Sequence, residues 1–150
     1  MTLTRRTLAA AVLAVSVPLA AQTGTPALPR MVEEVPFVTS PDNVTLEMLR
    51  LARVGPADHV IDLGSGDGRI VIVAARRFGG AGLGGGIGPD LVGRSLKSAR
   101  GAGVADKVDF KVQDLFQTDL SKATVITLYL LPEFNLRLRP ALLQLKPGTR

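Results

Sequence analysis

Cysteine and tryptophan are absent from the 150-residue chain, and histidine occurs once. Without cysteine there is neither a disulfide framework nor a thiolate zinc site. The single histidine, His59, cannot build a histidine-based metal site, so we expect no metal ion. Aromatic residues make up only 4% of the chain and the net charge is a modest +5. So few stacking side chains and so weak a basic character disfavour nucleic acid as a partner.

The apolar content is that of a folded protein. Hydrophobic residues make up 46% of the sequence, which excludes a disordered chain. A length of 150 residues allows one domain with a core of its own.

The first 21 residues have the pattern of an export signal. Arg5 and Arg6 precede an apolar run from Leu8 to Ala21 that ends in small residues, as in a secretory signal peptide. The arginine pair partly resembles a twin-arginine signal, and the run is shorter than a membrane span requires. We therefore expect a signal peptide or an N-terminal anchor over 1–21 and a linker over 22–35. The protein would then be exported to the periplasm or associated with a membrane, and it would be cytoplasmic if the segment is not functional.

Strand-like and helix-like segments alternate through the rest of the chain. This alternation predicts an α/β fold, a Rossmann-like and mostly parallel sheet with helices on both faces. A ligand would bind beyond the carboxyl ends of its strands. The pattern predicts a helix from Asp42 to before Gly55, strands near 60–64, 82–87, 108–112 and 123–128, and helices near 68–78, 90–102 and 133–143.

A glycine-rich turn follows the first of these strands. Residues 60–69 read Val-Ile-Asp-Leu-Gly-Ser-Gly-Asp-Gly-Arg. Glycines let the backbone approach a ligand, and the helix that follows directs its free N–H groups at the bound molecule. The dinucleotide-binding turn, G-x-G-x-x-G, has a glycine where Arg69 stands here, and no Gly-Lys-Ser/Thr follows to make a P-loop.

The pattern Asp-x-Gly-x-Gly-x-Gly from Asp62 to Gly68 resembles motif I of the class I S-adenosylmethionine-dependent methyltransferases. Further segments read Val-Pro-Phe-Val-Thr-Ser-Pro at 35–41, Asp-Leu-Phe at 114–116 and Thr-Leu-Tyr-Leu-Leu-Pro-Glu at 127–133. Together they resemble the branch that includes the mitochondrial lysine methyltransferases of the adenine nucleotide translocase and the ATP synthase c subunit, with bacterial relatives. The resemblance makes 36–150 a methyltransferase domain.

The resemblance implies S-adenosylmethionine as the cofactor and gives roles to particular residues. Thr39 would belong to the segment that closes over the methionine end of the cofactor. Asp114 would accept a hydrogen bond from the adenine amino group, and Leu115 would donate its N–H to the same ring. Tyr129 and Glu133 would face the transferred methyl group and be the catalytic residues. The residues that would shape the pocket around the methionine and ribose parts are Asp62, Gly64, Ser65, Gly66, Asp67 and Gly68.

Several of these residues also have plainer interpretations. Asp114 would serve equally to cap the turn that follows it. Tyr129 would serve as a core aromatic, and Glu133 as a solvated carboxylate at the start of a helix.

The implied reaction is in-line displacement at the sulfonium methyl group by a neutral lysine amine of a protein substrate, with a membrane protein as one candidate. Two other functions stay open. One is a weak or inactive cofactor-binding or interaction module, and the other is a nucleic-acid methyltransferase.

The sequence departs from the family pattern in two places. The acid that binds the ribose hydroxyls at the end of the second strand is replaced by Gly86 in our alignment. The sequence also stops at Arg150, after about four strands, so we expect a sheet that is incomplete at its C-terminal end, lacks the last strands and exposes an apolar strand edge.

Overall fold

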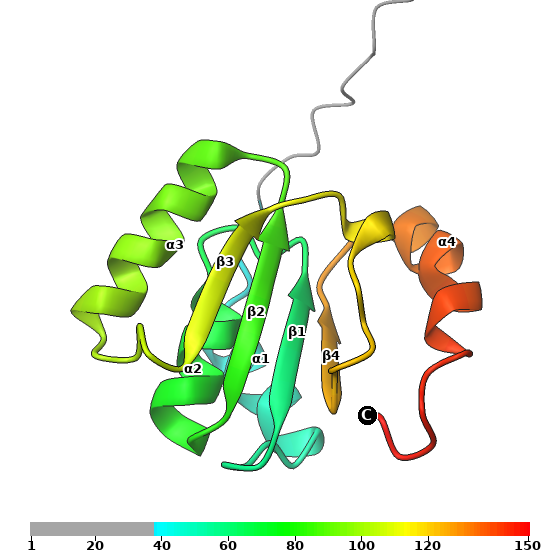
Figure 1. Cartoon of the computed structure of the whole chain (residues 1–150), viewed down its shortest axis with the longest axis horizontal. Helices are drawn as coiled ribbons and strands as arrows, with labels where there is room; N and C mark the ends of the chain where they lie inside the picture. The colour runs from blue at the N-terminus through cyan, green and yellow to red at the C-terminus, as the bar shows by residue number, and fades with distance from the viewer. Residues whose placement is uncertain (1–37) are drawn as a thin grey trace, which may run out of the picture. The chain divides into compact units, whose positions relative to one another are not determined.

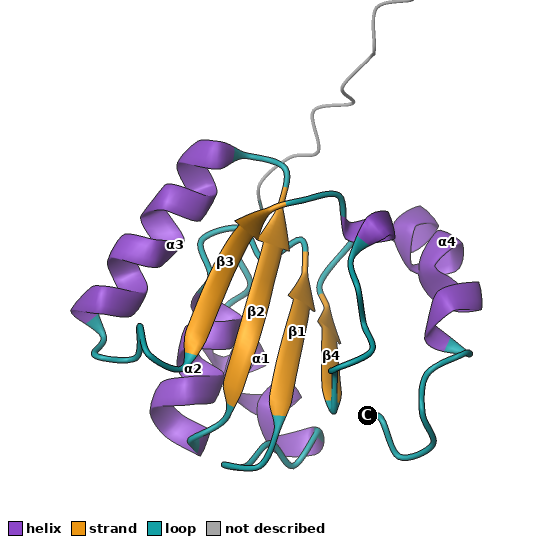
Figure 2. Ribbon diagram, in the orientation of Figure 1, coloured by secondary structure: helices purple, strands orange, loops and turns teal. Residues whose placement is uncertain are grey.

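Short apolar runs form the strands of one parallel sheet in the computed structural model, which describes residues 38–150 (Figures 1 and 2). The spatial order is β3-β2-β1-β4, and all three strand pairs are parallel. The signal peptide or anchor and the linker that we predict over 1–35 lie outside the described residues. The strands are β1 His59–Leu63, β2 Ala81–Gly86, β3 Val108–Val112 and β4 Val125–Leu128.

Helices alternate with the strands, and their ends carry the residues that favour helix boundaries. Pro89 and Pro132 open two of the helices, and Gly68 and Gly79, both with φ of +79°, flank a third. In residues 38–150 no helix is long and apolar enough to cross a bilayer. The helices are α1 Asp42–Leu51, α2 Arg69–Phe78, α3 Pro89–Gly101 and α4 Pro132–Leu142, with a 3-10 turn, η1, at Leu115–Gln117.

Side chains of β1 point alternately to the two faces of the sheet. Val60 packs in a buried cluster with Leu49 of α1 and Ala74 of α2. Ile61, the next residue, packs on the other face with Leu138 of α4. A further cluster joins α2 and α3 to β3. Helices therefore cover both faces, as the alternation of the sequence predicts, and the Rossmann-like fold class is confirmed.

Gly82 and Gly84 of β2 are required by close packing rather than by turns. A Cβ atom on Gly82 would lie 2.5 Å from the carbonyl oxygen of Val60, and one on Gly84 would lie 2.5 Å from the ring of Phe110. These contacts explain why the second strand carries few of the branched residues that usually mark a strand. Its sequence signal is weak partly because neighbouring residues leave no room for side chains at positions 82 and 84.

The outer edge of β4 is covered where the strand begins. The backbone N–H of Arg150 donates to Thr124 O at 3.0 Å, and the N–H of Ile126 donates to Arg150 O at 2.9 Å. The Arg150 guanidinium also pairs with the Asp58 carboxylate, which accepts a 2.7 Å hydrogen bond from the Thr124 hydroxyl. Our expectation of an exposed edge is therefore corrected for the first residues of β4.

Candidate active site

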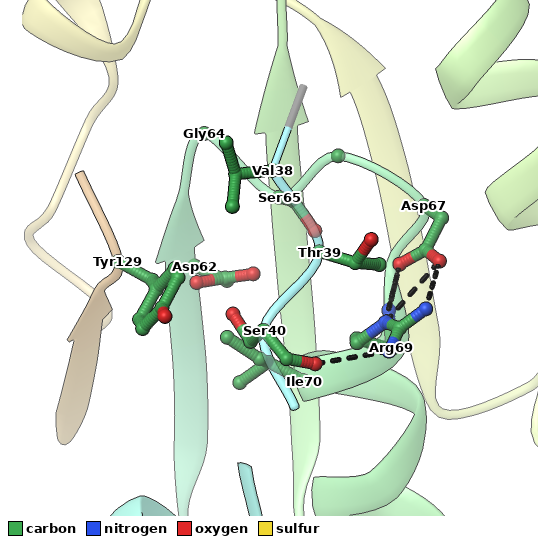
Figure 3. A pocket seen from close by; sticks show the side chains of 11 residues that line it. Val38, Thr39, Ser40, Asp62, Gly64, Ser65, Asp67, Arg69, Ile70 and Tyr129 are labelled. Atoms are coloured by element: carbon green, nitrogen blue, oxygen red, sulfur yellow. Dashed lines mark hydrogen bonds and ion pairs between the residues drawn. The ribbon is translucent and has the colours of Figure 1, made fainter. Parts of the chain in front are cut away.

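A pocket lies at the carboxyl ends of β1 and β4, where the direction of the strand order reverses (Figure 3). In open α/β sheets this switch point is the place where ligands bind. Three parts of the chain form its walls: the segment before α1, the glycine turn after β1, and the residue that follows β4. The lining residues are Val38, Thr39, Ser40, Asp62, Gly64, Ser65, Gly66, Asp67, Arg69, Ile70 and Tyr129.

The glycine turn holds its shape because larger residues do not fit there. Gly64 has φ of +78°, and a Cβ atom on it would lie 2.6 Å from Leu130 Cδ2. Gly68, with φ of +79°, packs against Phe110 and Ser95 in the same way. The turn is tied to β2, since Ser65 N donates to Gly85 O at 2.8 Å. The first and last glycines of the motif are thus fixed by both backbone conformation and space.

Asp62 places a buried carboxylate inside the pocket. Its side chain is 2% exposed and accepts a 2.6 Å hydrogen bond from Thr127 Oγ1 on the neighbouring strand. Burial raises the pKa of the Asp62 carboxyl to about 6, while the Thr127 and Ser65 hydroxyls act to lower it. No cation pairs with this carboxylate in the described part of the chain. At neutral pH the pocket therefore contains a mostly ionised carboxylate that suits a positively charged ligand.

Ser65 adds a polar group that lacks a partner. Its Oγ is buried and makes no hydrogen bond of acceptable geometry to any described residue, although it lies near enough to Asp62 to affect that pKa. Buried hydroxyls are nearly always hydrogen-bonded in native proteins. A ligand in the pocket would supply the missing partner.

Arg69 connects two walls of the pocket. Its guanidinium donates to the Asp67 carboxylate at 2.7 Å and to the carbonyl oxygen of Ser40 at 2.9 Å (Figure 3). From the sequence we used Arg69 only to exclude a dinucleotide, and we expected neither it nor Ile70 in the site, whereas Val38 and Ser40 belong to the segment around Thr39 that we expected to close over the cofactor. Arg69 was the one with a signal, a cation in the first turn of a helix, where the helix dipole disfavours it.

Most of the predicted site residues meet at this pocket, and four do not line it. Thr39, Asp62, Ser65 and Tyr129 line it together with Gly64, Gly66 and Asp67. Gly68 lies just behind, at the N-cap of α2. The three others outside the lining are Asp114, Leu115 and Glu133.

The three residues outside the lining lie at η1 and at the start of α4. Asp114 Oδ1 accepts the backbone N–H of Phe116 at 2.9 Å and so caps η1, which agrees with its plainer interpretation. Leu115 is half-buried in η1, and Glu133 is exposed in the first turn of α4. Tyr129, by contrast, lines the pocket and is 43% exposed, so it is not a core aromatic.

Gly86 ends β2 beside open space. A Cβ atom built on it would meet no heavy atom within 4 Å. Its carbonyl oxygen accepts the N–H of Gln113 at 2.9 Å, so the backbone is held although the side chain is missing. The position therefore has room for the first atom of a side chain.

Known proteins match this arrangement in sequence and in structure. Residues 62–150 match the family model described as the ANTKMT methyltransferase domain. The chain belongs to this methyltransferase family. The resemblance that the motifs indicate is therefore confirmed.

Three proteins illustrate how similar the chain is to known methyltransferases. A protein-lysine N-methyltransferase of Saccharolobus islandicus is 40% identical over 79% of this chain and 75% of its own length. The human lysine N-methyltransferase of the ATP synthase c subunit is 34% identical over 79% of this chain and 49% of its own length. A crystal structure described as an RNA methyltransferase from Salinibacter ruber, in complex with S-adenosyl-L-homocysteine, is 57% identical, covers 75% of this chain and 74% of that one, and has a TM-score of 0.73. The chain thus spans about half the length of the human relative that it matches.

The family, and the S-adenosyl-L-homocysteine bound to the relative, which is what S-adenosylmethionine becomes after it gives up its methyl group, identify S-adenosylmethionine as the cofactor. The residues of the pocket fit this molecule, because the glycine turn leaves room for close approach and Ser65 Oγ lacks a partner. The Asp62 carboxylate also suits a ligand that carries an ammonium and a sulfonium charge. Gly86, which we aligned with the ribose-binding acid of the family, carries no carboxylate.

Proposed function

We propose that this chain methylates the side-chain amine of lysine in a protein substrate. One observation carries the proposal: Asp62 and Tyr129, from adjacent strand ends, open into the same small pocket at the switch point of the sheet (Figure 3). The two lysine methyltransferases among the relatives support lysine as the acceptor.

The residues of the pocket would divide the work of binding. Asp62 would balance the positive charge of the cofactor, and Ser65 would hydrogen-bond to its methionine end. Thr39, Gly64, Gly66 and Asp67 would surround the same end, with Gly68 holding the turn behind them. Beyond the pocket, Asp114 and Leu115 would meet the adenine ring, as the family resemblance implies. Asp114 Oδ2 would be available to the adenine amino group, since it accepts only a long, 3.4 Å hydrogen bond from Gln117.

Methyl transfer needs an acceptor amine that is neutral and aligned. The cofactor supplies a methyl group that is already activated by the sulfonium charge. The lysine nitrogen would attack with its lone pair, the carbon–sulfur bond would break, and the extra proton would leave the nitrogen. Tyr129, which lines the pocket, would accept a hydrogen bond from the amine and orient it. Glu133, which is exposed outside the pocket, would receive the departing proton through water.

Transfer of a tritiated methyl group tests the acceptor. The purified chain is incubated with labelled S-adenosylmethionine and a mixture of proteins, and the modified residue is identified by mass spectrometry. We expect label on lysine, and chemical acetylation of the substrate lysines before the assay, which removes the basic lone pair of the amine, should abolish it. Absence of cofactor binding in the unmodified chain would instead support the interpretation as an inactive module.

RNA is a second candidate acceptor, because the 57% identical relative is described as an RNA methyltransferase. Against it stand the shortage of aromatics and the pocket itself, in which Tyr129 is the only aromatic lining residue from the described part of the chain. Label that survives protease and is lost with ribonuclease would favour RNA over protein.

We also propose where the protein acts, and this location determines which substrates it can meet. If residues 1–21 act as a signal peptide or an anchor, the substrate would be met at a membrane or in the periplasm. The ATP synthase c subunit, after which the human relative is named, is then a candidate substrate. Fractionation of cells that express the full chain, compared with a variant that begins at residue 36, would show whether 1–35 directs it there.

A further inference from the structure

Arg69 is the one side chain in the pocket that bonds two separate walls of it. On one side, its Nε and Nη2 donate to the Asp67 carboxylate of the glycine turn at 3.1 and 2.7 Å. On the other side, its Nη1 donates to the carbonyl oxygen of Ser40 at 2.9 Å and lies 3.4 Å from the Asp42 carboxylate. Ser40 and Arg69 are 29 positions apart in the sequence.

The segment 38–40, to which Arg69 donates its hydrogen bond, forms one wall of the pocket, and the glycine turn forms another. Val38, Thr39 and Ser40 all line the pocket, and Ser40 is nearly buried. Residues 38–40 have no regular secondary structure. Among the described residues, the Arg69 to Ser40 bond is the only hydrogen bond that joins these three residues to the rest of the chain.

The position of Arg69 is costly by local rules. It is the first residue of α2, where unpaired N–H groups and the helix dipole disfavour a cation, and α2 has no acid of its own in the first turn. Asp67 offsets the cost, since its Oδ1 also accepts the Arg69 backbone N–H at 3.3 Å. Residues that violate a local preference and are then compensated by neighbours are frequently tied to function.

Both members of this pair stay charged around neutral pH. Burial alone would raise the pKa of the Asp67 carboxyl, but the hydrogen bonds and charge of Arg69 outweigh burial and hold that pKa below its ordinary value. The same pairing raises the pKa of Arg69. A fork of guanidinium donors also fixes direction, which a lysine ammonium on the same carboxylate does not.

We infer that Arg69 is a positioning residue for cofactor binding: it latches residues 38–40 onto the glycine turn, so that the pocket is closed around the methionine end of the cofactor. Without the latch the turn and the Asp62 carboxylate stay in place. The segment from Val38 to Ser40 then loses its anchor, and the cofactor leaves faster. This inference depends on the proposed function only in that the pocket takes the cofactor, and it holds whatever the methyl acceptor is.

The test measures S-adenosylhomocysteine binding to the full chain by titration calorimetry and stopped flow. We expect Arg69→Gln to raise the dissociation constant by about tenfold or more, the usual effect of losing a hydrogen bond to a charged group, mainly through faster dissociation. Arg69→Lys keeps the charge but cannot bond both walls at once. Its dissociation constant should therefore lie between those of the unmodified chain and Arg69→Gln. Arg76→Gln, an exposed arginine in the last turn of the same helix, is the matched control and should bind as the unmodified chain does.

Two readouts separate latching from general support of the fold. Hydrogen exchange of a peptide that covers 38–46 should accelerate in Arg69→Gln, while peptides from β1 and β4 keep their protection. Where methyl transfer is measured, KM for the cofactor should rise more than kcat falls. An Arg69→Gln protein that melts earlier but binds with an unchanged dissociation constant overturns the inference. Failure of the unmodified chain to bind S-adenosylhomocysteine at all counts against the proposed function instead.

Discussion

Thr127 Oγ1 donates a 2.6 Å hydrogen bond to Asp62 Oδ1, which joins two neighbouring strands at the point where the pocket begins. Both side chains are buried, so the bond lies out of contact with bulk water. It holds an ionisable group in a place where ionisation is costly. The carboxylate is therefore oriented by the fold before any ligand arrives.

The pH dependence of stability should show the cost of burying Asp62. Its carboxyl has a pKa of about 6 in the folded protein against an ordinary value of 3.8, so the folded state holds the proton more tightly. The stabilising contribution is full below pH 4 and is lost as pH rises through 6, which corresponds to about 3 kcal/mol. The free energy of unfolding of the unmodified chain, relative to that of Asp62→Asn, should fall by most of this amount, roughly 2 kcal/mol, between pH 4 and 7 in urea titrations. A difference that stays constant with pH contradicts the prediction.

An acidic residue in place of Gly86 should strengthen cofactor binding. Because a Cβ atom there meets nothing within 4 Å, Gly86→Asp or Gly86→Glu can add a carboxylate acceptor beside open space. We expect the dissociation constant of S-adenosylhomocysteine to fall by roughly tenfold to a hundredfold, as for hydrogen bonds gained to a charged group. Gly86→Ala adds the Cβ without the acceptor and serves as the control. Equal binding by the acidic variants and Gly86→Ala would refute our alignment of the second strand.

Replacement of Gly64 should damage the pocket as well as the fold. Gly64→Ala forces a Cβ into a positive-φ residue beside Leu130, whereas Gly103→Ala, at φ of +71°, meets nothing within 4 Å. Both variants should lose about 1 kcal/mol or more of folding free energy from backbone strain. Only Gly64→Ala should also weaken S-adenosylhomocysteine binding. Thermal melts and calorimetry on the two proteins separate strain from contact, and equal binding by both would contradict the role of the turn.

The two candidate catalytic side chains should differ in their kinetics. Tyr129→Phe removes a hydroxyl in the pocket, keeps the half-exposed ring, and should reduce kcat by about tenfold or more. Cofactor binding should change little. Glu133→Gln alters an exposed residue outside the pocket and should have the smaller effect on kcat. The reverse order would make Glu133 the residue that acts on the amine.

How much the sequence predicts depends on whether the signal is local. The glycine turn is a local motif, so its resemblance to the methyltransferase motif was enough to name Asp62, Gly64 and Gly66, and the structure brings them to the same pocket. The strand at 108–112 alternates buried and exposed side chains over its first four residues, and its bounds match the prediction.

Contacts between residues that are far apart in the chain leave no local signal in the sequence. The bond from Arg69 to the Ser40 carbonyl joins distant residues through a backbone oxygen, which any amino acid at position 40 would offer. The weak second strand has the same origin, because the space at Gly82 and Gly84 is set by Val60 and Phe110 on other strands. The capping of η1 by Asp114, in contrast, is local and was one of the two interpretations that the sequence allowed.

Gly84 lies behind the pocket and lines none of it, yet a Cβ on it would collide with both Ser65 Oγ and the Phe110 ring. Position 84 should therefore tolerate substitution as poorly as the cofactor-binding turn itself. A map of mutational tolerance would mark Gly84 as essential for a reason of space alone. The space needed by the pocket thus constrains the sheet one layer deeper, at a residue that does not line the pocket.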